Sequence, residues 1–89
     1  MSQSYPNPFT EGGTTIEFDM PVTEQITMVI LDIRGRVVRT LINNEQRFGY
    51  QSVVWDAKND DGDKVSSGVY FYQIRSTNFN AVGKLVFVK

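Results

Sequence analysis

Alternation of apolar and polar residues with a period of two is the feature that most constrains what this chain can fold into. It is clearest over residues 69–77, where Tyr70, Tyr72 and Ile74 fall on one face of an extended chain. This period is typical of half-buried β-strands, and no segment sustains the 3.6-residue repeat of an amphipathic helix. Turn-forming residues separate the alternating segments, which are residues 14–20, 25–33, 36–43, 50–57, 69–77 and 81–88.

Residue type decides the predicted structure of three further parts of the chain. Residues 36–43 also fit helical spacing, but their β-branched side chains favour a strand. Pro21 cannot donate a ladder hydrogen bond, so it predicts the end of the strand that begins at residue 14. The polar residues 43–49 predict a loop.

The spacing of these segments predicts an all-β domain, an immunoglobulin-like antiparallel β-sandwich of about seven strands over residues 14–89. Residues 1–13 hold two of the three prolines and predict an extended, Pro/Gly-rich lead-in, with Tyr5 or Phe9 docking on the domain. The predicted core is Ile16, Phe18, Ile26, Met28, Ile30, Val53, Trp55, Tyr70, Tyr72 and Ile74.

The amino-acid composition argues against several classes of function. Nine basic and ten acidic side chains give a net charge of -1, which offers no bulk attraction to nucleic acid. The absence of cysteine and histidine removes thiolate nucleophiles, disulfides, the commonest general base and the commonest metal ligand. The longest apolar run, residues 28–31, is far shorter than the roughly 20 residues of a membrane span, so no membrane insertion is expected. We therefore expect no enzyme, catalytic residue, metal or cofactor.

Three sets of side chains are of the kinds that bind metal, catalyse hydrolysis or bind sugars. Residues 59–63 are rich in oxygen ligands for calcium but lack the ligand spacing and late glutamate of a calcium loop, so a turn is favoured. The carboxylate pairs on strands, Glu17 with Asp19 and Asp32 with Asp56, are more typical of a soluble outer face than of catalysis. Phe71 and Tyr50 are the outward aromatic residues that a sugar-binding surface would use.

The final segment, residues 84–89, is an uncharged β-rich stretch flanked by lysines. As structure, it is a last strand whose charges discourage edge pairing. As a signal, it offers a receptor both a strand edge and positive charge. The residues alone favour the structural interpretation, and an uncovered last strand would also permit a weak homodimer.

Several segments occur together in an order that resembles a known family. They are Tyr5-Pro6-Asn7-Pro8-Phe9, Thr14-Thr15-Ile16-Glu17-Phe18, Leu31-Asp32-Ile33-Arg34-Gly35-Arg36-Val37-Val38, Trp55-Asp56, Asp61-Gly62 and Ser67-Gly68-Val69-Tyr70-Phe71-Tyr72-Gln73-Ile74. The chain resembles, over nearly its whole length, the type A C-terminal sorting domain of the type IX secretion system. That domain is related to the immunoglobulin-like module of the flagellar hook-capping protein.

The resemblance implies a non-catalytic sorting domain at the end of a larger cargo protein of Bacteroidota or their relatives. Its implied partners are the outer-membrane translocon and a sortase-like peptidase, and its implied destination is the cell surface or the exterior, reached through the periplasm. By position, the residues that match the family's recognition motif are Gly68, Tyr70, Lys84, Val86, Val88 and Lys89.

Two other functions remain open from the sequence. One is a structural assembly module like the hook-capping domain, which would associate through its sheet edges. The other is a carbohydrate-binding accessory module, for which Phe71 and Tyr50 would have to form an exposed pair on one sheet.

Overall fold

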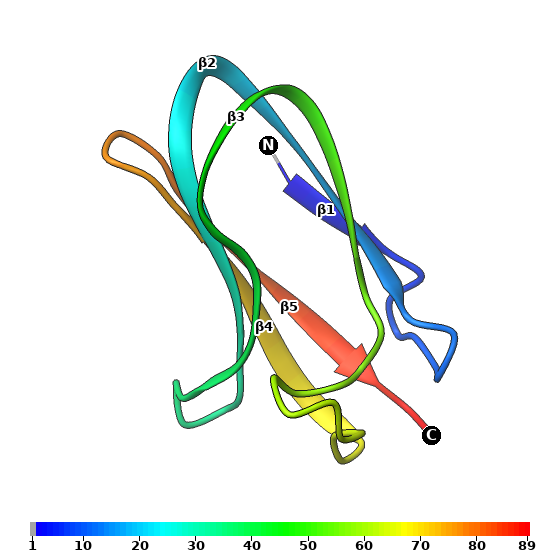
Figure 1. The fold of residues 1–89 in the computed structure, drawn as a ribbon. Helices are drawn as coiled ribbons and strands as arrows, with labels where there is room; N and C mark the ends of the chain where they lie inside the picture. The colour runs from blue at the N-terminus through cyan, green and yellow to red at the C-terminus, as the bar shows by residue number, and fades with distance from the viewer. Residues whose placement is uncertain (1) are drawn as a thin grey trace.

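The computed structural model describes residues 2–89 as five antiparallel β-strands, with no helix among them and hence none able to span a membrane (Figure 1). The all-β, antiparallel prediction is confirmed, whereas the expected sandwich of about seven strands is not: residues 2–89 form one curled sheet of five strands. Met1, the first residue of the predicted lead-in, lies outside the described residues. The strands are β1 (Ser2–Tyr5), β2 (Thr14–Leu31), β3 (Val37–Trp55), β4 (Gly68–Arg75) and β5 (Asn80–Phe87).

The strand count differs because β2 and β3 each join two predicted strands. β2 runs through Pro21, and β3 runs through residues 43–49, which were expected to be a loop. The register between them shifts after the Met20–Gly49 pair, so the exposed Pro21 sits at an irregularity where no ladder hydrogen bond is needed. Pairing with β2 also explains why polar residues of β3 remain extended, since strand propensity depends on neighbours more than on residue type.

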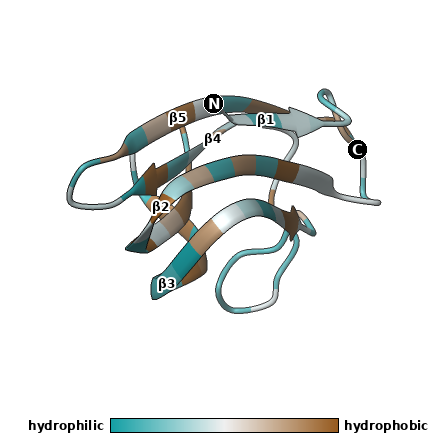
Figure 2. Ribbon diagram, turned by 90° about the horizontal axis from the view of Figure 1, so that it is seen from above, coloured by the Kyte–Doolittle hydropathy of each residue, from teal (hydrophilic) through white to brown (hydrophobic). Residues whose placement is uncertain are grey.

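A single sheet curls around the core (Figure 2). The first part of β2 pairs with β1 and with the end of β3, while its last part pairs with β4 and with the start of β3. β5 continues the sheet beyond β4. The length of β2 therefore connects the two halves of the curl, and no separate second sheet exists among residues 2–89.

Aromatic residues fill the inside of the curl. Trp55 is fully buried, with its ring 5.3 Å from that of Tyr70 and 5.6 Å from that of Phe9. All predicted core residues are buried except Val53, which is half-buried and packs against the cluster. Of the two lead-in aromatics, Phe9 docks and Tyr5 stays 50% exposed. The prediction missed the buried residues Phe9, Met20, Val29, Ile42, Ala57, Leu85 and Phe87.

Gly83 of β5 leaves room for an aromatic ring from the neighbouring strand. It lies directly opposite Tyr72 of β4, and a β-carbon at Gly83 would overlap the Tyr72 ring. The Tyr72 hydroxyl then reaches Ser2 of β1 and donates a 2.7 Å hydrogen bond to its Oγ. A side chain from β4 thus crosses β5 and connects it with the other end of the sheet.

We predict that Phe9→Ala lowers the free energy of unfolding by about 3–5 kcal/mol, because it removes a buried ring and leaves a cavity beside Trp55. Phe48→Ala is the matched control, since Phe48 is 65% exposed and should change stability by less than about 0.5 kcal/mol. Urea unfolding followed by Trp55 fluorescence measures both. Equal effects of the two substitutions would contradict the anchoring role of Phe9.

Candidate functional site

The outer edge of the last strand, the edge that faces away from β4, is covered by residues 7–9, here called the N-terminal clasp. Phe9 forms an isolated parallel bridge with Phe87. Its backbone N–H donates to the carbonyl oxygen of Val86 at 2.8 Å, and its own carbonyl accepts the N–H of Val88 at 2.8 Å. The start of the chain therefore adds a short parallel pairing to the end of the chain.

The Asn7 side chain extends this pairing by one step. Its Nδ2 donates to the carbonyl oxygen of Lys84 at 2.7 Å, and its Oδ1 accepts the N–H of Val86 at 2.9 Å. A primary amide offers one donor and one acceptor in the geometry of a peptide group, so Asn7 takes the place of a strand residue. Consequently the clasp satisfies the outward backbone groups of the last strand from the Lys84 carbonyl to the Val88 N–H.

Packing holds the clasp in place. The Phe9 ring is 1% exposed and stacks on Phe87 with 5.1 Å between ring centroids. Thr14 Oγ1 also donates a 2.9 Å hydrogen bond to the carbonyl of Pro6, which fixes the chain just before the clasp. The predicted lead-in is therefore part of the folded domain: residues 2–5 form β1, and Phe9 belongs to the core.

The six residues matched to the recognition motif do not form one site. Tyr70 is buried against Trp55 and donates a 2.7 Å hydrogen bond to the Ser66 carbonyl. Burial raises the pKa of Tyr70, with a smaller contribution from the nearby charge of Asp32. Gly68 begins β4 opposite Phe87, with a φ of 153°. Tyr70 therefore belongs to the core, whereas Gly68 is exposed at the start of β4.

The other four residues of the motif lie on the surface at the end of the chain. Lys84 and Val86 point away from the core on β5, Lys84 exposed and Val86 half-buried. Val88 is 48% exposed, and the N–H of Lys89 donates to Ser67 Oγ at 3.0 Å. Sequence reasoning missed Asn7, because nothing in the YPNPF segment shows which distant strand its amide meets.

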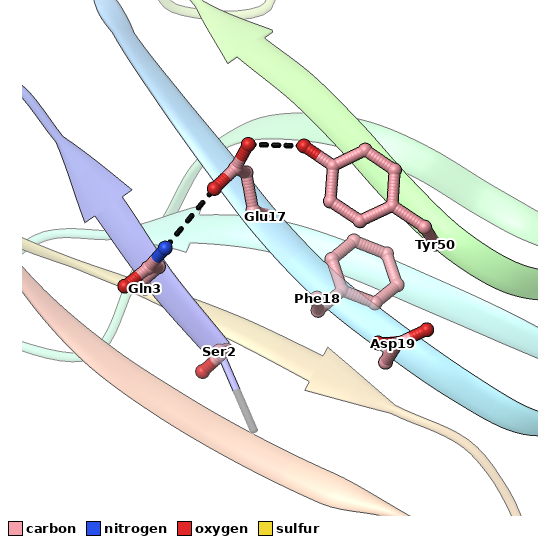
Figure 3. Close-up of a pocket in the computed structure, with 6 residues that line it drawn as sticks. All are labelled: Ser2, Gln3, Glu17, Phe18, Asp19 and Tyr50. Atoms are coloured by element: carbon pink, nitrogen blue, oxygen red, sulfur yellow. Dashed lines mark hydrogen bonds between the residues drawn. The ribbon is translucent and has the colours of Figure 1, made fainter.

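A second cluster of polar contacts surrounds Glu17 on the outer face of β1, β2 and β3 (Figure 3). The Glu17 carboxylate accepts hydrogen bonds from Gln3 Nε2 at 3.1 Å, from the Tyr5 hydroxyl at 2.9 Å and from the Tyr50 hydroxyl. These donors lower the pKa of Glu17, Tyr50 most, and the carboxylate in turn raises the pKa of Tyr5 and Tyr50. The cluster links three strands beside a shallow hollow of about 220 Å³ lined by Ser2, Gln3, Glu17, Phe18, Asp19 and Tyr50.

Several sequence candidates turn out to have local contacts. Phe71 is half-buried on β4 whereas Tyr50 is 61% exposed on β3, so these two do not form the exposed pair expected for a sugar-binding surface.

Asp32 accepts the backbone N–H groups of Arg34 and Arg36 and closes the hairpin between β2 and β3. In the 59–63 segment, the Asn59 side chain likewise accepts two backbone N–H groups, from Asp61 and Asp63. Residues 2–89 contain no cluster of metal-ligating side chains.

Comparison with known proteins shows which family has this architecture. Residues 4–79 match the family model described as the FlgD Ig-like domain. The chain belongs to this family. Two curated relatives, the basal-body rod modification protein FlgD of Salmonella typhimurium and that of Salmonella typhi, are each 40% identical over 63 residues. The match covers 71% of this chain and 27% of each relative, so the chain corresponds to about a quarter of those proteins.

A solved structure shares the fold over nearly the whole chain. It is PorZ, described as an essential bacterial surface component of the type IX secretion system of Porphyromonas gingivalis. The superposition has a TM-score of 0.69 at 22% identity and covers 99% of this chain but 11% of PorZ. The family match ends at Phe79, whereas this structural likeness extends over β5 as well.

We predict that Asn7→Ala lowers the free energy of unfolding by about 1–3 kcal/mol, because the Lys84 carbonyl and the Val86 N–H both lose their partner. Asn43→Ala is the control, since the exposed Asn43 side chain makes no hydrogen bond within residues 2–89. Urea denaturation gives the difference, and amide exchange should speed up at Val86. Unchanged exchange at Val86 would show that Asn7 does not protect the strand edge.

The lowered pKa of Glu17 predicts how the stability of the domain depends on pH. Its pKa is lowered in the folded protein from an ordinary value of 4.5, so its contribution to stability is complete above that value and is lost as the pH falls through the folded pKa. Tyr50→Phe removes the hydrogen-bond donor that lowers the Glu17 pKa most. The pKa should therefore rise towards 4.5, which NMR titration of the Glu17 carboxyl carbon measures. Asp32 is the internal control, because its low pKa depends first on the Arg36 backbone. A Glu17 pKa that stays unchanged in this variant would contradict the assignment.

Proposed function

We propose that this chain is a non-catalytic sorting domain that directs a larger cargo protein through the type IX secretion system to the cell surface or the exterior. The observation that carries the proposal is the structure of the terminal segment, residues 84–89. Its backbone is integrated into a closed fold, while Lys84, Val88 and Lys89 present their side chains to solvent. Likeness to a segment of PorZ, itself a type IX component, supports the same assignment.

The closed fold suits such a role. A sorting domain has to fold independently of its cargo and expose a recognisable end. Here the clasp, residues 7–9, pairs with residues 84–88, so this part of the last segment is held in one conformation. The partners proposed for it are the outer-membrane translocon and a sortase-like peptidase, and the cargo would lie upstream on the same parent chain.

The relation to FlgD favours one second candidate, a structural assembly module. The 40% identity to the Salmonella proteins concerns the Ig-like domain itself, so a scaffold role is the alternative that sequence similarity supports. A scaffold would act through the body of the domain and would tolerate additions after Lys89. A sorting domain would not, which separates the two proposals.

We predict that a periplasm-targeted fluorescent protein fused to residues 2–89 is exported by a type IX-competent host, and that a Gly-Ser tail of about six residues after Lys89 reduces export about tenfold or more. The tail leaves the core intact, whereas deleting residues 84–89 would also remove the buried Leu85 and Phe87. The same six residues inserted beside the exposed Gly35 form the matched control and should leave export unchanged.

Fluorescence in washed cells, on the cell surface and in the medium measures export. If the fusion with a free end stays in the periplasm although the domain is folded, the sorting function is wrong. If the tailed fusion is exported equally well, the terminal segment is not the signal and the assembly module becomes the better proposal.

A further inference from the structure

The clasp restricts how a partner can recognise the last strand. Addition of a partner strand needs free backbone groups at the sheet edge. From the Lys84 carbonyl to the Val88 N–H, those groups already pair with Asn7 and Phe9. Freeing them would pull the Phe9 ring, 1% exposed, out of the core. Side chains, and not the backbone, are therefore the accessible part of this segment.

These side chains form a continuous surface on the outside of the curl. Val82, Lys84 and Val86 alternate with the buried Leu85 and Phe87, so all three point outward from β5. In β4, Phe71 lies opposite Lys84, and Val69 lies opposite Val86. Cross-strand neighbours of this kind are in contact distance, so they make one patch. We call it the terminal face, and it consists of Val69, Phe71, Val82, Lys84 and Val86.

The last segment of the chain carries charge of one sign. Residues 64–89 contain four basic side chains, Lys64, Arg75, Lys84 and Lys89, and no acidic one. Lys64 is paired with Glu11, but neither Lys84 nor Lys89 forms an ion pair among residues 2–89. Lys84 lies between Val82 and Val86 on this face and opposite Phe71, and Val82 is 57% exposed. Complementarity therefore calls for a partner surface that is largely apolar and places a carboxylate opposite Lys84.

We propose that the acceptor of the sorting pathway docks on the terminal face, through an apolar surface that carries a carboxylate for Lys84, while the clasp stays closed. This inference rests on the proposed sorting function and deepens it. It assigns the contact to Phe71 and Val82 as well as to Lys84 and Val86. It also gives Asn7 and Phe9 the role of positioning residues, which hold the strand without touching the partner.

The first test compares two valines of equal exposure on different faces of the sheet. Val82 on the terminal face is 57% exposed, and Val54 on β3 is 59% exposed. We expect Val82→Asp to reduce export of the fluorescent fusion about tenfold or more, because it places a carboxylate against the partner's apolar surface and near the partner carboxylate that meets Lys84. Val54→Asp should be exported like the parent. Thermal unfolding of the purified variants confirms that both are folded.

The second test locks the clasp. The chain has no cysteine, so Thr10→Cys with Val88→Cys introduces the only thiol pair, on the two residues that follow the Phe9–Phe87 bridge. Thr10 and Val88 adjoin the bridged pair, and non-reducing gels of the purified protein show what fraction is disulfide-linked. Export of the disulfide-linked protein, seen on non-reducing gels of the medium, is the expected result. Export of only the unlinked form of this double variant would show that the partner displaces the clasp, which overturns the proposal.

The outcomes separate this inference from the function on which it rests. If the parent fusion is not exported, the sorting function itself fails. If the parent is exported and Val82→Asp behaves like Val54→Asp, sorting stands and the terminal face is not the docking surface. If light scattering shows that the parent dimerises and Val82→Asp is monomeric, the face joins two copies of this chain and the acceptor proposal is wrong.

Discussion

Closure of the curled sheet by Phe9 is the interaction on which the rest of the structure depends. A five-stranded sheet of this size has to cover the inside of its curl, and β1 and β5 are not hydrogen-bonded to each other. Phe9 fills that gap by stacking on Phe87 and packing against Trp55. Its backbone at the same time completes the edge of the last strand. One residue thus serves the core and the sheet edge together.

The same closure determines what the surface can do. An unpaired β5 would present a row of free N–H and C=O groups and would invite pairing with other chains. With Asn7 and Phe9 in place, the outer backbone groups from the Lys84 carbonyl to the Val88 N–H are paired. A partner can therefore contact this segment only through its side chains. The homodimer through an uncovered last strand stays a prediction, and it could not use the edge from Lys84 to Val88, which the clasp covers.

The family relation and the terminal segment concern different parts of the chain. The FlgD Ig-like match ends at Phe79, and the likeness to PorZ continues through β5. The shared architecture explains the curled sheet and its aromatic core. The features that support sorting, the two unpaired lysines and the exposed valines, lie in residues 82–89, after the family match ends. Function is thus proposed from the site, on a fold that other proteins use differently.

Sequence alone determined the strand character and most of the core, because a period of two and β-branched and aromatic residues are local properties of the chain. Tyr70, Tyr72 and Ile74 were predicted to be buried and are. It could not show that β2 continues through Pro21, since a bulge depends on the partner strand. Nor could it separate Phe9 from Tyr5 or find Asn7, whose amide contacts a residue 77 positions away. Tertiary structure alone decided that the two ends of the chain meet, because only packing against Trp55 and Phe87 brings the clasp to the last strand.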